Sequence, residues 1–207
     1  PGEDGASQQA VEDVALACSL PGFVVCVPSD EFQMRAAVRA AYRHRGPVYL
    51  RLGRPKVPRI YDAEPADFEF GRATLLREGR DATIIANGLM VAAAIVAHER
   101  LAQEGIRVRV LDMATVKPLD EEAVRRAAVE TGAIVTAEEH LVHGGLGARV
   151  AQAVARLHPV PMEFVGLDDT YAESGAPEAL LRKYGLTADH IIAAVRRVLD
   201  RRGNGAR

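Results

Sequence analysis

The chain has 207 residues, 48% of them hydrophobic and 26% charged, with a formal net charge of −2, a length and balance that suit one large or two small globular domains. Acidic and basic residues are interspersed without a long basic stripe, which argues against a nucleic-acid partner. The longest strongly apolar stretch, residues 89–97, is well short of the roughly 20 residues that cross a bilayer, and no signal peptide opens the chain, so we expect a cytoplasmic protein without a membrane partner.

The first quarter of the chain alternates between helical and strand-like patterns. Apolar residues from Gln9 onward recur at helical spacing until Pro21-Gly22 breaks the pattern. The next run is nearly all apolar, which is typical of a strand covered on both faces in a parallel sheet, and Ser29 or Asp30 can cap the helix that follows. The expected elements are a helix over residues 9–17, a strand over 23–27, a helix over 30–44 and a strand over 48–52. This order predicts α/β units with right-handed crossovers.

Residues 53–67 contain three prolines and no sustained period, which predicts an extended linker rather than packed structure. Beyond them strands and helices alternate again. The expected strands cover residues 73–76, 83–86, 106–111, 133–137 and 162–165, and the expected helices cover 90–103, 120–130, 144–157, 177–184 and 188–200. The second unit is therefore predicted to hold a mainly parallel sheet of about five strands flanked by helices.

Several short motifs resemble, in order, those of transketolases. Residues 2–13 resemble the GEDG-x-S/T-H-Q-x-x-E signature of the transketolase pyrimidine-binding domain, and residues 27–30, 46–49 and 51–54 match later segments of that domain. In the second half, residues 110–120 resemble VIDxxTIKPLD, residues 138–147 resemble EEH followed by GGLG, and residues 173–187 resemble ESG followed by YGLT. The common order of these matches makes the resemblance specific, and it covers nearly the whole chain.

The resemblance implies a domain organisation. Residues 1–58 would be the second part of a pyrimidine-binding domain, residues 59–69 a linker, residues 70–200 a complete transketolase C-terminal domain, and residues 201–207 a tail. In the family, the glutamate that activates the cofactor lies upstream of the GEDG segment, and a separate domain with a GDG…N motif holds the diphosphate. We expect both to be missing here, so that no catalytic or metal-binding residue is assigned to this chain.

The resemblance also implies a function. The complete enzyme would use thiamine diphosphate and Mg²⁺ to transfer a two-carbon ketol unit between sugar phosphates, while the isolated chain would bind neither and would not turn over. The cofactor carries the carbanion chemistry and the protein supplies position and electrostatics. We expect a homodimer, with a separate amino-terminal subunit if the enzyme is split between two chains.

Three residues are candidates for contacting substrate. Asp4 matches the family position that meets a sugar hydroxyl, where a carboxylate selects stereochemistry by accepting a hydrogen bond; the alternative is a turn-forming Asp before Gly5. Gln8 occupies the family's histidine position and departs from it, since an amide donates and accepts hydrogen bonds but carries no charge. Arg54 matches the arginine that binds the acceptor's phosphate with its guanidinium fork, and Arg51 is a second candidate for that role.

Other polar residues receive structural interpretations. His140 and His143 beside Glu138 and Glu139 could be read as a metal cluster, but the segment matches a family stretch without a metal role. Cys18 and Cys26 fall in apolar patterns, and we interpret them as buried small side chains rather than a disulfide.

Two rival functions stay open. The first is another thiamine enzyme, either the β subunit of a 2-oxo-acid dehydrogenase or a deoxyxylulose-phosphate synthase; the GEDG and RLGR segments favour transketolase over both. The second is a non-catalytic module that uses the C-terminal domain for assembly, and Gln8 is its best support.

Overall fold

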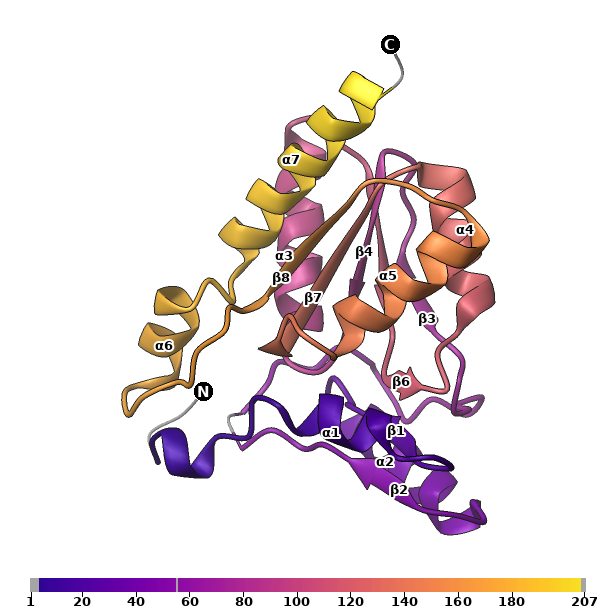
Figure 1. Ribbon diagram of the computed structural model, residues 1–207, viewed down its shortest axis with the longest axis vertical. Coiled ribbons are helices and arrows are strands. Elements are labelled where there is room, and N and C mark those ends of the chain that lie inside the picture. Colours follow the sequence, from indigo (N-terminus) through magenta and orange to yellow (C-terminus); the bar gives the residue numbers. More distant parts are fainter. Residues whose placement is uncertain (1–3, 55, 206–207) are drawn as a thin grey trace.

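The computed structural model describes residues 4–54 and 56–205 and contains two sheets, one of three strands and one of five. Gly2 and Glu3 of the first motif and Pro55 of the predicted linker lie outside the described residues. In Figure 1 the small sheet and its helices lie below the carboxyl ends of the large sheet's parallel strands. The α/β class predicted from the sequence is confirmed.

The small sheet is built mainly from the first fifty residues. Its elements are the short 3₁₀ helix η1 (Ala6–Gln8), α1 (Asp13–Ser19), β1 (Val24–Cys26), α2 (Glu31–Arg43) and β2 (Val48–Leu50). β1 is buried at every position and pairs in parallel with β2, as its all-apolar sequence predicts. Asp30 caps α2, because its side chain accepts a hydrogen bond from the backbone amide of Gln33 at 2.8 Å.

The first helix begins at Asp13, so the prediction that it begins at Gln9 is wrong. The carbonyl of Ala10 accepts a hydrogen bond from Arg51, and the carbonyl of Val11 accepts one from the amide of Leu141. Because these carbonyls are bound to groups from distant segments, they do not accept the hydrogen bonds that would start a helix there. The first such bond runs from the amide of Leu16 to the carbonyl of Glu12.

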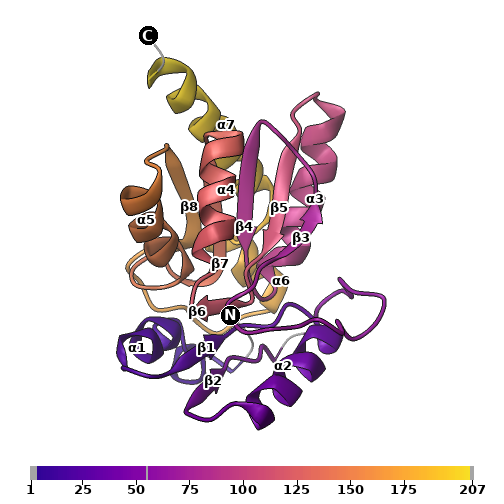
Figure 2. The ribbon, with the colours of Figure 1, turned by 90° about the vertical axis from the view of Figure 1, so that its right-hand side faces the viewer.

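The large sheet has the order β3-β5-β4-β7-β8, in which all neighbours are parallel except β3 and β5. Its strands are β3 (Thr74–Arg77), β4 (Ala82–Ala86), β5 (Val108–Asp112), β7 (Ile134–Leu141) and β8 (Met162–Leu167). Its helices are α3 (Met90–Gln103), α4 (Glu121–Thr131), α5 (Leu146–Leu157), α6 (Pro177–Lys183) and α7 (Ala188–Gly205). α3 and α7 cover one face and α4 and α5 the other, as Figures 1 and 2 show. The predicted five-stranded, mainly parallel sheet is confirmed.

Two strands escaped prediction in whole or in part. β6 (Thr115–Lys117) pairs antiparallel with β1, so that the small sheet has the order β2-β1-β6. β7 continues to Leu141, past the predicted end at Ala137, through the polar residues 138–140. β6 is too short to show a period, and the carboxylates and imidazole of β7 obscure its strand pattern. The domain limits at residues 58 and 70 stay a prediction, although β6 carries a strand from beyond them into the first sheet.

The segment between β2 and β3 contains no helix or strand among its described residues, but it is packed against both units. The amides of Ile60 and Tyr61 donate to Asp30 Oδ2 at 2.8 and 2.9 Å, and Phe68 and Phe70 pack on a buried cluster that includes Cys26. The expectation of an unpacked linker is therefore wrong. Its backbone amides are bound to a side chain rather than to a strand, which leaves no periodic pattern in the sequence.

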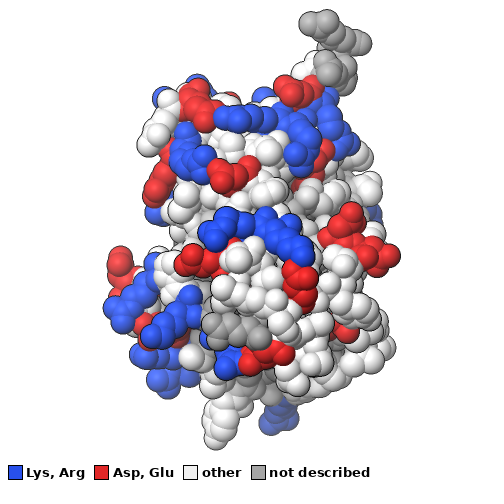
Figure 3. All heavy atoms as spheres, turned by 90° about the vertical axis from the view of Figure 1, so that its left-hand side faces the viewer, with Lys and Arg blue, Asp and Glu red and all other residues white. Residues whose placement is uncertain are grey.

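Charged residues of both signs alternate over the surface. In Figure 3 basic and acidic side chains lie next to one another over the face that it draws. On α7, Arg197 and Arg201 both bind Glu163 at 2.9 Å, and Arg196 binds Glu104 at 2.6 Å. None of the described helices combines the length and apolar character needed to span a membrane. Cys18 and Cys26 are buried free thiols, as predicted.

Candidate functional site

A cleft of about 780 Å³ lies where the two units meet. Its walls come from the segment before α1, from β2 and the residues that follow it, from the carboxyl end of β7 and from the first residue of α6. The side chains that line it include Asp4, Gln8, Asp13, Tyr49, Arg51, Arg54, Lys56 and Glu139. A neighbouring cavity of about 560 Å³ shares Arg51, Arg54, Lys56 and Glu139 with it. Carboxyl ends of parallel strands are the usual place for ligands in α/β proteins.

The structure brings Asp4, Gln8 and Arg54 to this one cleft. Gln8 ends η1, and Asp4 and Arg54 form an ion pair whose side chains are 38% and 75% exposed. Both charges are thus accessible, and a bound ligand can compete for either of them.

Arg51 differs from Arg54, because its guanidinium is bound to protein on every nitrogen. Nε donates to Asp13 at 3.1 Å, Nη1 to Glu139 at 3.2 Å and Nη2 to the carbonyl of Ala10 at 2.9 Å. Its side chain is 15% exposed. Burial lowers the pKa of Arg51, but the carboxylates of Glu139 and Asp13 outweigh it and raise that pKa above its ordinary value. Arg51 therefore ties the walls of the cleft together, and its suggested role as a phosphate ligand does not fit this geometry.

Tyr49 belongs to the same cluster. Its hydroxyl donates to Asp13 Oδ2 at 2.6 Å. Burial and this hydrogen bond to a carboxylate raise the pKa of Tyr49 to about 12. Asp13 thus accepts hydrogen bonds from two neighbours on the β2 side of the cleft, Tyr49 and Arg51, and neither contact was predicted from the sequence.

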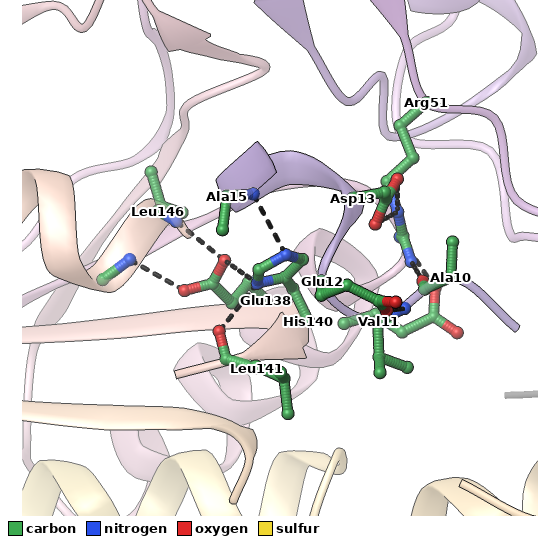
Figure 4. Close-up of polar contacts among 12 residues, drawn as sticks. Ala10, Val11, Glu12, Asp13, Ala15, Arg51, Glu138, His140, Leu141 and Leu146 are labelled. Carbon is green, nitrogen blue, oxygen red and sulfur yellow. Dashed lines mark hydrogen bonds and ion pairs between the residues drawn. The ribbon is translucent and has the colours of Figure 1, made fainter. Parts of the chain in front are cut away.

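The end of β7 joins the two units, as Figure 4 shows. Glu138 is buried and accepts hydrogen bonds from the amides of Leu146 and Gly147, at 2.7 and 2.8 Å, at the start of α5. Burial raises the pKa of Glu138, and these amides and the charge of Arg51 oppose that shift. Glu139, on the opposite side of the strand, binds Arg51. Successive side chains of β7 therefore lie on opposite sides of the strand, so that Glu138 binds the start of α5 and Glu139 lines the cleft.

His140 serves as a structural hydrogen-bonding residue. Its Nε2 accepts from the amide of Ala15 in α1 at 3.3 Å, while its Nδ1 lies 2.7 Å from the carbonyl of Leu141. Since a carbonyl only accepts, Nδ1 carries the proton and the ring is neutral in this arrangement. Among residues 4–54 and 56–205, no group of three or more His, Cys, Asp or Glu is placed to hold a metal ion.

Comparisons with known proteins agree with this architecture. The family model for the transketolase pyrimidine-binding domain matches residues 1–59, and the model for the transketolase C-terminal domain matches residues 71–191. The chain belongs to the transketolase family. A solved structure of a split-gene transketolase, described as an inactive beta4 tetramer, has a TM-score of 0.91 to this transketolase chain with 50% sequence identity, over 95% of this chain and 64% of that one.

Two curated relatives are transketolase subunits. The 6-deoxy-6-sulfo-D-fructose transketolase subunit SqwH of Clostridium sp. (strain MSTE9) is 46% identical over 199 residues, which are 96% of this chain and 62% of that protein. One of the subunits of the apulose-4-phosphate transketolase of Phocaeicola vulgatus is 40% identical over 187 residues, 90% of this chain and 60% of that protein. The transketolase chain described here thus spans about three fifths of each relative's length.

A second polar cluster, outside the lining of the larger cleft, fastens the two units of this transketolase chain to the linker. Asp112, at the end of β5, is buried, and its Oδ2 accepts from Ser29 Oγ, Gln33 Nε2 and Tyr61 Oη at 2.8, 2.9 and 2.8 Å. Burial raises the pKa of Asp112 to about 6, against the opposing effect of these hydrogen bonds. The carboxylate of Asp112 thus binds one group from the linker and two from the first unit.

The raised pKa of Asp112 predicts a pH-dependent stability. The folded state binds its proton more tightly than the unfolded state, so the stabilisation is complete below about pH 4 and is lost as pH rises through about 6. Two pH units correspond to about 3 kcal/mol. In urea unfolding from pH 4 to 7, we expect the difference in free energy of unfolding between the unmodified chain and Asp112→Asn to shrink by up to that amount. A difference that stayed constant from pH 4 to 7 would contradict the raised pKa of Asp112.

Proposed function

We propose that this chain is one part of a thiamine-diphosphate-dependent transketolase that transfers a two-carbon ketol unit from a ketose to an aldose. The observation that carries the proposal is the convergence of Asp4, Gln8 and Arg54 on one cleft at the carboxyl ends of the strands. These residues come from two segments about fifty residues apart, and each stands at a family position that meets substrate.

Each of the three residues has a distinct proposed role. The carboxylate of Asp4 accepts a hydrogen bond from a hydroxyl of the sugar and so favours one stereochemistry. Gln8 donates and accepts hydrogen bonds near the reacting oxygens, without the charge that a histidine would bring there. The guanidinium of Arg54, which is three-quarters exposed and paired with the partly exposed Asp4, binds the anionic end of the substrate in a bidentate manner.

The residues of this chain suit the substrate side of the site better than the metal side. The cleft offers hydrogen-bonding groups and cations, but none of the described His, Cys, Asp and Glu residues form a set of three that could hold Mg²⁺. We propose, from the resemblance to transketolases, that another polypeptide segment holds the diphosphate and Mg²⁺ and completes the cleft. When bound, thiamine diphosphate supplies the carbanion chemistry for breaking and forming the carbon–carbon bond.

The substrates are proposed to be sugars with an oxyanion terminus. One relative is named for a sulfonated fructose and another for apulose 4-phosphate. Sulfonate and phosphate both present several acceptor oxygens in a tetrahedral arrangement, which the fork of Arg54 can bind. Competition between a sulfonated and a phosphorylated sugar as substrates measures which of the two groups the enzyme prefers.

The complete enzyme is proposed to contain further chains. Both relatives are called subunits, and the structural relative is a tetramer of beta chains described as inactive. We propose that this chain self-associates, as a homodimer or a higher oligomer, and gains activity with an amino-terminal subunit. The two free thiols suit a reducing compartment, and we propose that the complete enzyme is cytoplasmic.

A calorimetric titration tests the proposal. Thiamine diphosphate with Mg²⁺ is added to this chain alone, and then to the chain mixed with its amino-terminal subunit. We expect binding and ketol transfer only in the mixture. Tight binding by the isolated chain would contradict the assignment of the cofactor to another segment.

The same mixture separates the rival functions. Turnover of a 2-oxo acid, or formation of deoxyxylulose phosphate, in place of ketol transfer would assign the chain to another class of thiamine enzyme. Assembly without cofactor binding or turnover of any of these substrates would assign it to a non-catalytic module.

A further inference from the structure

Glu139 carries a charge from the large sheet into the lining of the cleft. It is 8% exposed, lines both neighbouring cavities and binds Arg51 Nη1 at 3.2 Å. Its direction is fixed from both sides, because the preceding residue is held by the amides of α5 and the following residue by the amide of Ala15. Glu138 and His140 lie next to each other, with Oε2 and Nδ1 3.8 Å apart, and Glu139 between them in the chain lines the cleft.

The charges that line the larger cavity are balanced. Among the residues that the structure describes, three are acidic, Asp4, Asp13 and Glu139, and three are basic, Arg51, Arg54 and Lys56. Of the basic residues, Arg51 is held between Asp13 and Glu139, whereas Arg54 is 75% exposed and paired with the partly exposed Asp4. Without Glu139, Nη1 of Arg51 would lose its acceptor and the lining would gain one net positive charge.

We propose that Glu139 is a positioning residue that determines substrate specificity. It holds Arg51 away from anionic ligands, so that Arg54 alone binds the anionic end of the substrate and places the substrate in the position that the reaction needs. The C-terminal domain thereby sets the charge of the cleft. The inference rests on the proposed function where it concerns the choice of substrate. The change in phosphate affinity that it predicts requires neither cofactor nor turnover.

The test is a titration of inorganic phosphate into the isolated chain, followed by the backbone amide signals of residues 49–54 in NMR spectra. Glu139→Gln keeps the shape of the side chain and removes its charge. Because one charge about 5 Å away acts through a dielectric close to that of water in an open cleft, we expect phosphate affinity to rise about three- to tenfold, with an increase that shrinks as salt is added. Glu139→Asp, which keeps the charge, should stay within about twofold of the unmodified chain.

Two further measurements separate positioning from general stability. Glu104→Gln breaks a surface ion pair with Arg196 outside the cleft lining and should leave phosphate affinity unchanged. Thermal unfolding of each variant reports its stability independently. Unchanged or lower phosphate affinity in Glu139→Gln, whether or not its Tm falls, would overturn the proposal and leave Glu139 a structural residue. A failure of ketol transfer in the reconstituted enzyme would leave this result intact, so the two proposals fail separately.

Discussion

Replacing Arg51 with leucine is expected to destabilise the chain by about 3 kcal/mol, because it leaves two largely buried carboxylates facing each other without their shared cation. Asp13 and Glu139 have side chains that are 12% and 8% exposed, and both bind the Arg51 guanidinium. The carbonyl of Ala10 also loses its hydrogen-bond donor. Urea unfolding at pH 7 measures the loss.

Arg54→Leu is the matched control for this substitution. It removes the same side chain three residues away, but from an ion pair that is mostly exposed, so its cost should stay within about 1 kcal/mol. The double variant Arg51→Leu/Glu139→Leu should lose less stability than the sum of its two single variants, because their interaction is removed once and not twice. Equal losses of stability in the Arg51 and Arg54 variants would contradict a stabilising role for the ion pairs of Arg51 with Asp13 and Glu139.

Gly145→Ala is expected to cost about 3 kcal/mol or more for a different reason. A Cβ atom at this position would lie 2.1 Å from Glu138 Oε2 and 2.7 Å from His140 Nδ1. The carboxylate cannot swing away easily, because it is buried and held by two amides of α5. The added methyl therefore breaks charge-assisted hydrogen bonds in addition to crowding the site. Thermal unfolding measures the effect.

Gly203→Ala tests whether that cost is steric. Gly203 lies within α7, and a Cβ atom there would meet nothing within 4 Å. Alanine forms helix better than glycine, so this variant should gain up to about 1 kcal/mol. A comparable loss in both variants would show that glycine flexibility, and not the buried Glu138 cluster, explains the sensitivity of position 145.

The predictions for Arg51 and Gly145 both concern contacts made by the end of β7, where the two units meet. Glu138, Glu139 and His140 are consecutive, yet they contact α5, the cleft and α1 respectively. Glu139 lines the cleft, and its neighbours Glu138 and His140 bind the backbone amides of α5 and α1. Through Glu139 the second unit contributes to the lining of the cleft that also contains Asp4, Gln8 and Arg54.

The sequence by itself determined the class of fold, most of the elements and the family. All-apolar strands and amphipathic helices carry their burial pattern in the order of residues, so β1, β4, α3 and α5 could be predicted from local periodicity. The order of short motifs pointed to transketolase, and the three candidate substrate residues followed from matching positions. Capping of α2 by Asp30 was also visible, because its partner lies only three residues away.

Tertiary structure alone decided which cations are available and what joins the units. Arg51 and Arg54 look alike in the sequence, but Arg51 meets Glu139 across 88 residues, and each nitrogen of its guanidinium is hydrogen-bonded to protein. β6 becomes a strand only because β1 offers it unpaired backbone groups, and α1 starts late because Arg51 and β7 bind the carbonyls before it. These features depend on hydrogen bonds and charges from distant segments, and the local pattern of residues does not contain that information.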